Sequence, residues 1–177
     1  MSTYAAILRA INVSGRNKIT MPALRDAFVA LGYEDVVTYI QSGNVVFRTR
    51  APRAKLGATI EDCIAREFGQ SVKAVLRSAK ELADIVAKNP FLTRRGVDRA
   101  HLHVTFLAST PARAAVSSLS VPSGSDELII AGKDVYVYAP GGYGKTKVNN
   151  TFVERRLGVA TTRNWNTVTK LFELTAG

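Results

Sequence analysis

The sequence predicts an α+β protein built of two ferredoxin-like (split βαβ) halves in tandem, in which antiparallel sheets carry helices. Before residue 78, strand-like and helix-like segments follow one another in the order βαββαβ, which is the split βαβ arrangement. After residue 100 the order βαββα follows, without obvious sequence identity to the first half. We therefore assign residues 1–88 to a first half with a connector helix and residues 89–177 to a second half with a C-terminal helix. A single unrelated α+β domain is the alternative.

The first half begins with a strand and a helix. Residues 3–11 form a short, apolar and partly β-branched run, as strands do, and a polar loop at 12–18 follows. Thr20 is placed to cap a helix that has Pro22 in its first turn, and Gly32 ends the apolar pattern of this helix.

A hairpin, a second helix and a last strand complete the first half. Residues 36–40 and 45–47 flank Gln41-Ser42-Gly43-Asn44, which is the pattern of two antiparallel strands joined by a Ser-Gly turn. Apolar residues four positions apart then predict a helix over 52–68, and a strand over 72–76 follows.

A connector leads into the second half. Ser78, with Glu81 three residues later, forms a capping box for a helix that ends before Pro90, and the polar segment 89–100 is the predicted boundary. The elements expected beyond it are a strand over 101–107, a helix over 111–119, strands over 128–131 and 135–138, and helices over 149–157 and 165–174. The last helix takes the place of a final strand.

Composition limits the class of protein. The chain has 177 residues, 46% hydrophobic and 21% charged, so it is long enough for a core and unlike a disordered chain. No apolar run approaches a membrane span, and the start lacks the features of a signal peptide. The single cysteine, Cys63, excludes an intrachain disulfide and fits a reducing compartment, so we expect a cytoplasmic protein without membrane partners. A net charge of +10 favours anionic ligands or polyanionic partners.

Two segments resemble a known family. They are residues 8–17 (LRAINVSGRN) and 38–47 (TYIQSGNVVF), and the likeness continues at 89–91 (NPF), in the Gly-rich loop before Lys145 and at 161–167 (TTRNWNT). In these motifs the chain resembles the bacterial family known only as domain of unknown function 1697. The resemblance implies an α+β fold of two similar halves and no established reaction, cofactor or catalytic residue.

The chain departs from the usual pattern of that family at two positions. Members commonly begin LRGINVGGxN, whereas this chain has Ala10 and Ser14 in place of two of the glycines. A loop conformation that requires a positive φ at these positions is disfavoured, because Ala and Ser avoid it.

The loop after the first strand and the hairpin turn are the first candidate sites. The loop offers Asn12, Arg16, Asn17 and Lys18 beside backbone amides, which suits a phosphate or a carboxylate. In the turn, the amide and hydroxyl groups at 41–44 suit a base or another polar ligand. A packed surface loop and an ordinary hairpin closure are the structural alternatives.

The Gly-rich loop at 139–146 satisfies a loosened phosphate-loop pattern with Lys145 and Thr146. Its context argues against nucleotide hydrolysis, because the strand before it belongs to a predicted antiparallel hairpin and phosphate-loop enzymes use a parallel sheet. A connection rich in turn residues is the alternative.

Near the C-terminus, Arg163 could pair with an anion and Trp165 could stack on a base or sugar. In the structural alternative, Asn164 or Thr162 caps the last helix and Trp165 packs into the core.

Other chemistry-bearing residues give weaker patterns. His101 and His103 are expected on one side of one strand, without an evident third ligand, so we predict no metal site. Basic clusters at 48–55, 94–99 and 145–156 suit nucleic-acid phosphates, but the aromatic pattern of an RNA-recognition sheet is missing. Solvated basic faces are the alternative.

We therefore expect a protein that binds an anionic ligand, either a nucleotide or nucleic acid, through loops rich in amides and basic residues. The alternatives are an enzyme acting on a phosphorylated or nucleotide-like small molecule, in which Lys145 or Arg163 stabilises negative charge, and a purely structural or interaction protein. The candidate ligand-binding residues are Arg9, Asn12, Asn17, Lys18, Gln41, Ser42, Asn44, Lys145, Arg163, Asn164 and Trp165.

Overall fold

The computed structural model describes residues 1–9, 11–12 and 18–177, and the chain divides into two compact units. Unit 1 comprises Met1–Ala83 and Leu171–Gly177, and unit 2 comprises Asp84–Lys170. The divisions fall inside α3 (Ala79–Ala87) and α6 (Trp165–Ala176), so each of these helices contributes residues to both units.

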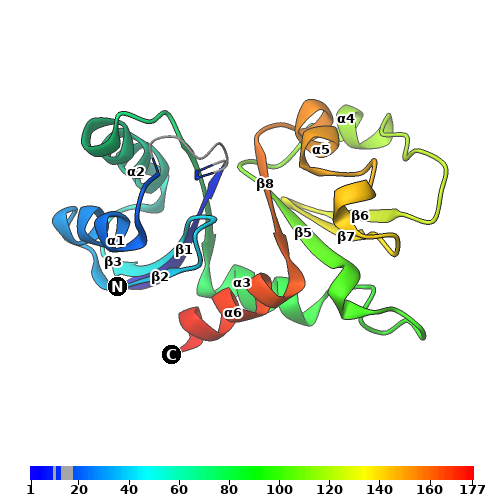
Figure 1. The fold of residues 1–177 in the computed structure, drawn as a ribbon, viewed down its shortest axis with the longest axis horizontal. Helices are drawn as coiled ribbons and strands as arrows, with labels where there is room; N and C mark the ends of the chain where they lie inside the picture. Colours follow the sequence, from blue (N-terminus) through cyan, green and yellow to red (C-terminus); the bar gives the residue numbers. More distant parts are fainter. Residues whose placement is uncertain (10, 13–17) are drawn as a thin grey trace. The chain divides into compact units, whose positions relative to one another are not determined.

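Unit 1 has the ferredoxin-like order that the sequence predicts. Two helices, α1 (Met21–Ala30) and α2 (Arg53–Phe68), cover one face of a four-stranded antiparallel sheet (Figure 1). The strands of the sheet, in spatial order, are β2 (Glu34–Tyr39), β3 (Asn44–Thr49), β1 (Ser2–Arg9) and β4 (Lys73–Ser78).

The core of unit 1 lies between this sheet and its two helices. Phe28 of α1 contacts the ring of Phe47 edge-on, and Tyr33 stacks on Phe47 with 4.6 Å between ring centroids. Ala5 and Ile7, on the other face of β1, are also fully buried. Burial on both faces explains why β1 is an almost continuous apolar run rather than an alternating one.

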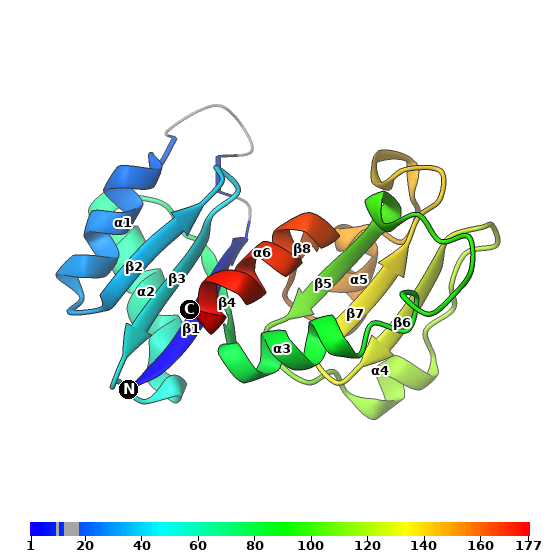
Figure 2. The same cartoon turned by 90° about the horizontal axis from the view of Figure 1, so that it is seen from below.

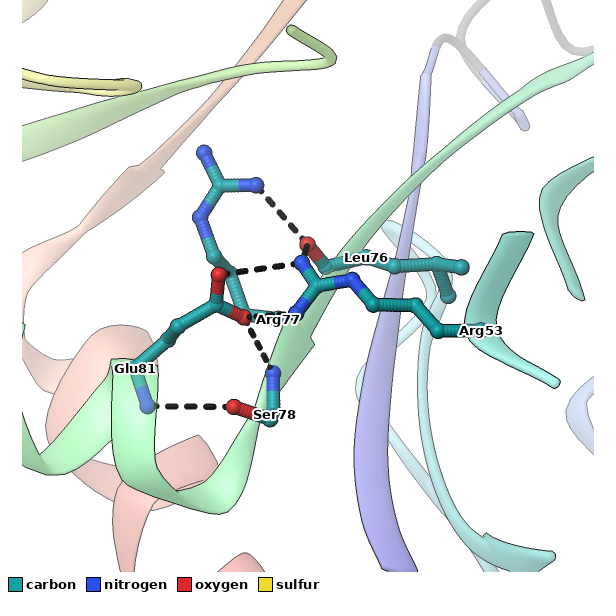
Figure 3. A network of polar contacts seen from close by, with 5 residues as sticks. All are labelled: Arg53, Leu76, Arg77, Ser78 and Glu81. Carbon is teal, nitrogen blue, oxygen red and sulfur yellow. Dashed lines mark hydrogen bonds and ion pairs between the residues drawn. The ribbon is translucent and has the colours of Figure 1, made fainter. Parts of the chain in front are cut away.

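The predicted helix caps are confirmed. The Thr20 hydroxyl accepts a hydrogen bond from the Ala23 amide at 3.3 Å. At the start of α3, the Ser78 hydroxyl accepts from the Glu81 amide at 3.2 Å, and the Glu81 carboxylate accepts from the Ser78 amide at 2.8 Å (Figure 3). Arg53 adds an ion pair to Glu81 at 2.8 Å, so this capping box also ties α2 to the end of β4.

Unit 2 repeats the same architecture. Its four-stranded antiparallel sheet has the spatial order β6 (Glu127–Ala131), β7 (Asp134–Tyr138), β5 (Leu102–Leu107) and β8 (Ala160–Asn164). One face is covered by α4 (Arg113–Ser117) and α5 (Asn150–Leu157) (Figure 1, Figure 2). Short 3-10 helices at Arg99–His101 and Tyr143–Lys145 complete the described elements.

The prediction that a helix replaces the final strand was wrong, because β8 is present and makes the second half βαββαβ. β8 pairs antiparallel with β5, with Thr162 opposite Thr105. Its sequence, ATTRN, lacks the apolar alternation of a half-buried strand because its polar groups hydrogen-bond inside the protein. The Thr162 hydroxyl contacts the Thr105 hydroxyl at 2.7 Å, and the Arg163 guanidinium donates to the Thr161 hydroxyl at 2.8 Å.

The junction between the last strand and the following helix has the same design in both halves. Arg77 in β4 and Arg163 in β8 are 1% and 8% exposed. Each donates through Nη1 to the carbonyl of the residue before it, at 2.8 and 2.9 Å. The next residue, Ser78 or Asn164, caps the following helix by accepting from the amide three residues on. This shared pair of residues marks the repeat within otherwise dissimilar sequences.

Replacing Asn164 by Ala removes the cap of α6 and should lower the free energy of unfolding by about 1 kcal/mol. Asn164→Asp keeps an acceptor and should retain most of the stability. Asn166→Ala, at an exposed position in the same helix, is the matched control and should leave stability unchanged. Urea denaturation of the four proteins measures this, and equal losses in N164A and N166A would contradict the capping role.

Candidate functional site

A polar cavity of about 550 Å³ lies in unit 1, next to the ends of β1 and of the β2–β3 hairpin. We call it the amide cavity, and its lining residues are Ile11, Asn12, Lys18, Gln41 and Ser42. Four of these five are predicted ligand-binding residues, and they come from two segments about 25 residues apart in the sequence. The structure thus brings together two motifs that the sequence indicated separately.

The Asn12 side chain holds the cavity together. Its Nδ2 donates to the carbonyls of Ile19 at 2.9 Å and Gln41 at 3.0 Å, and its Oδ1 accepts from the Ile19 amide at 2.8 Å. Asn12 has a φ of 58°, a left-handed conformation that Asn tolerates better than most residues. Because both amide protons and the carbonyl oxygen are engaged, Asn12 shapes the cavity rather than offering a free group to a ligand.

The other wall is the turn between β2 and β3. Asn44, fully buried, donates through Nδ2 to the Tyr39 carbonyl at 2.9 Å and to the Ser42 hydroxyl at 3.1 Å. Ile40 has a φ of 49°, which is rare for a β-branched residue, and is 46% exposed. Asn44 is therefore a structural residue of the turn, and Gln41 and Ser42 are the turn residues that line the cavity.

Lys18 and Gln41 carry the groups available to a ligand. Lys18 is exposed and has no acidic partner among the described residues. Gln41 is also exposed, and within the described part of the chain its side-chain amide makes no hydrogen bond, although its backbone carbonyl is held by Asn12. An ammonium group and an amide therefore share a cavity whose five lining residues include no carboxylate. This combination suits an anion with a neighbouring hydrogen-bonding group.

Arg9, Arg16 and Asn17 are the other predicted residues of this region, and Arg16 lies outside the described residues. Arg9, half-buried at the end of β1, is opposite Lys73 of β4 and does not line the amide cavity. Asn17 lies outside the described residues.

In unit 2 the predicted residues near the C-terminus have structural roles. The side chain of Asn164 caps α6 through the Thr167 amide at 2.9 Å, and Trp165 is buried. Burial lowers the pKa of Arg163 to about 10, so its guanidinium is charged at neutral pH and is held by its own strand. These contacts favour the capping and packing alternative for this segment.

Side chains of the Gly-rich loop make hydrogen bonds to neighbouring parts of unit 2. The Thr146 hydroxyl donates to Asp126 at 2.7 Å and accepts from the Val148 amide at 3.2 Å. The Tyr143 hydroxyl accepts from the Asn150 amide at 2.8 Å, at the start of α5. Phosphate-loop sites need a hydroxyl that can bind magnesium and a helix N-terminus whose amides are free. In this loop both groups already make hydrogen bonds within the protein, and Lys145 is an exposed side chain beside them.

A polar cluster on the helix-covered face of the unit 2 sheet was missed by the sequence analysis. His103 stacks on Tyr143 with 4.3 Å between ring centroids. Close by, the Thr162 hydroxyl donates to Asn150 at 2.9 Å and, because its proton is used there, accepts from Thr105. The alternation of β5 places His103 and Thr105 on one face, and this was the only signal in the sequence.

The expectation that His101 and His103 project from one side of one strand was wrong. His101 belongs to the 3-10 helix Arg99–His101, where its Nε2 lies 3.9 Å from Asp98. Only His103 is in β5. In the described ranges, no three His, Cys, Asp or Glu side chains are placed to share a metal ion.

Some residues of the predicted basic clusters are engaged within the protein. Arg48 pairs with Asp35 at 2.8 Å, and Arg94 with Glu127 at 2.6 Å. Arg156 lies over the Phe152 ring, 3.8 Å from its centroid. Each of the three predicted clusters thus has at least one arginine that contacts another side chain of the protein.

Comparison with known proteins identifies the family. The model of the family described as "Protein of unknown function (DUF1697)" matches residues 1–136. The chain belongs to the DUF1697 family. Among solved structures, this DUF1697 member is similar to the conserved bacterial protein SP0830 from Streptococcus pneumoniae, with 25% identity and a TM-score of 0.80 over 100% of this chain and 99% of that one. No curated protein matches.

The TM-score over the full length confirms the predicted fold, with two similar α+β halves in tandem. Among the helices that the structure describes, none combines the length and apolar content that a membrane span requires.

Gly43→Ala tests the tight packing beside the amide cavity. A Cβ at Gly43, whose φ is 82°, would lie 2.4 Å from Cδ1 of Ile11, so overpacking adds to backbone strain. We expect the free energy of unfolding to fall by about 2–4 kcal/mol. Gly32→Ala is the matched control, because Gly32 has a φ of 80° and open space around it. Equal losses in the two variants, measured by denaturation, would show that the Ile11 contact is unimportant.

His103 should make stability depend on pH. Burial lowers the pKa of His103 below its ordinary value of 6.5, and a hydrogen bond with the His101 backbone opposes this shift only in part. The unfolded chain therefore binds a proton more readily than the folded one, so stability is complete above pH 6.5 and falls as the pH drops towards the folded pKa.

His103→Phe keeps a ring to stack on Tyr143 but does not titrate, so its stability should fall less between pH 7 and 5 than that of the wild type. The difference between the two denaturation midpoints, followed against pH, measures the effect. Parallel curves for the two proteins would exclude His103 as the titrating group.

Proposed function

We propose that this chain binds an anionic ligand, a nucleotide or a nucleic-acid segment, in the amide cavity. The observation that carries the proposal is the presence of Lys18, without an acidic partner in the described ranges, beside the Gln41 amide in a cavity of about 550 Å³. Ligand pockets commonly have volumes of 300–1,000 Å³ and a few convergent polar groups.

The arrangement of the cavity supports binding rather than simple loop closure. Asn12 and Asn44 satisfy the backbone and side-chain groups of the two loops among themselves. Lys18 and Gln41 are not needed for this closure, because neither side chain takes part in it. Polar groups that are held near a cavity without a structural partner are available for recognition.

The proposal places the protein in the cytoplasm. Cys63 is free and buried against the Ala27 carbonyl, and burial raises its pKa, so it is an inert thiol suited to a reducing compartment.

Lys18→Gln should weaken ligand binding about tenfold, because a hydrogen bond to a charged group contributes about 1.5–3 kcal/mol. Lys147→Gln, which removes the same charge from an exposed position of unit 2, is the matched control and should bind like the wild type. Fluorescence anisotropy with labelled single-stranded RNA and DNA, and with free nucleotides as competitors, measures both.

Equal binding by wild type and K18Q, or no binding of any probe at low salt, would refute the proposal. Circular dichroism spectra and thermal midpoints of the variants establish that they are folded.

A further inference from the structure

We infer that the ligand of the amide cavity is a small molecule with one anionic group beside an amide-like hydrogen-bonding edge, such as a nucleoside monophosphate, and not a polynucleotide. This inference rests on the proposed function and names the class of ligand for the same site. It follows from the charge around the cavity, the position of the aromatic residues and the roles of its polar groups.

The described lining of the cavity offers positive charge for one phosphate. Among the described residues that line it, Lys18 is the one cation. Elsewhere in unit 1, Arg48 is paired with Asp35 at 2.8 Å, Arg53 with Glu81 at 2.8 Å and Lys73 with Glu61 at 3.0 Å. Proteins that bind single strands instead use a continuous basic groove that follows the backbone. Here Arg48 and Lys73 on the sheet and Arg53 on α2 are engaged with carboxylates.

The packing of four aromatic residues of unit 1 also argues against strand binding. Single-stranded nucleic acids are bound by aromatic side chains on which successive bases stack. Tyr4, Phe28, Tyr33 and Phe47 instead pack against one another in the core between the sheet and its helices. None of the described residues that line the amide cavity is aromatic.

Three polar side chains of the cavity have two kinds of role. One of them, the frame, holds the backbone of the cavity, and the other two, the readers, contact the ligand. Asn12 is the frame, since its donors and its acceptor are used by the Ile19 and Gln41 backbone. Lys18 supplies the charge for the anion. The Gln41 side chain, whose backbone is fixed by Asn12, has both a donor and an acceptor and is therefore complementary to the edge of a nucleobase or another amide.

Two variants separate the roles of the readers. Lys18→Gln should weaken binding of inorganic phosphate and of nucleoside monophosphates alike, about tenfold. Gln41→Ala should weaken the monophosphates about three- to tenfold and leave phosphate unchanged, because it removes a neutral hydrogen bond. Isothermal titration calorimetry on the full chain, with the four ribonucleoside monophosphates and with phosphate, measures both, and K147Q is the control.

The salt dependence of binding counts the phosphates that the site contacts. An RNA octanucleotide held at one phosphate should give a slope of about −0.7 in log K against log salt, and a monophosphate should displace it. A slope steeper than about −2, without displacement by monophosphates but still dependent on Lys18, would overturn the inference and leave the proposed function standing.

Two further results have distinct meanings. If Q41A binds phosphate and monophosphates with equal losses, Gln41 does not read the ligand, and the inferred ligand class is wrong. If neither phosphate, monophosphate nor octanucleotide binds at low salt, the proposed function and the inference both fail.

Discussion

The candidate site depends on one side chain, Asn12, which holds the segment after β1 against the turn of the neighbouring hairpin. The backbone ladder between β1 and β3 reaches Ile7 and Asn44, and the Leu8 amide extends it to the Gly43 carbonyl at 2.8 Å. β1 continues to Arg9, which pairs with β4, and after it the side-chain amide of Asn12 joins the following segment to the hairpin turn through the Gln41 carbonyl. A cavity forms here because the two segments are joined at Asn12 by a side chain and not by continuous backbone pairing.

The feature that the two halves share is a pair of polar residues, not a pattern of apolar ones. A buried arginine near the end of the fourth strand is followed by a capping residue, Ser78 in one half and Asn164 in the other. A buried guanidinium needs hydrogen bonds, and in both halves a carbonyl of its own strand accepts one. The arginine thus fixes the end of the strand at the point where the helix must start.

Much of the fold could be predicted from the sequence because its local signals agree with the final structure. Thr20, Pro22, Ser78 and Glu81 mark helix starts, and the Ser-Gly turn marks the hairpin. β8 could not be predicted, because its sequence is polar although the strand lies inside the protein. The hydrogen bonds that make this possible are formed by the side chains of Thr161, Thr162 and Arg163. Strands of this kind cannot be detected from the periodicity of apolar residues.

The candidate site was only partly predictable. The sequence indicated the loop at 12–18 and the turn at 41–44 as separate motifs, but their meeting depends on β1 and β3 being neighbours in the order β2-β3-β1-β4. The distinction between Asn12 as a frame and Gln41 as a reader depends on hydrogen bonds that residue type does not reveal. Residue type also does not reveal that Arg163 and Trp165 are buried. Their burial favours a packing role over a role in ligand recognition.

Unit 1 is discontinuous in the sequence, since it needs Leu171–Gly177 as well as Met1–Ala83. Leu171 and Thr175 are buried, so this last segment is part of the packed structure. A ribosome therefore releases all of unit 2 before it supplies the final piece of unit 1. The half that carries the amide cavity starts to fold first on the nascent chain and reaches its complete structure last.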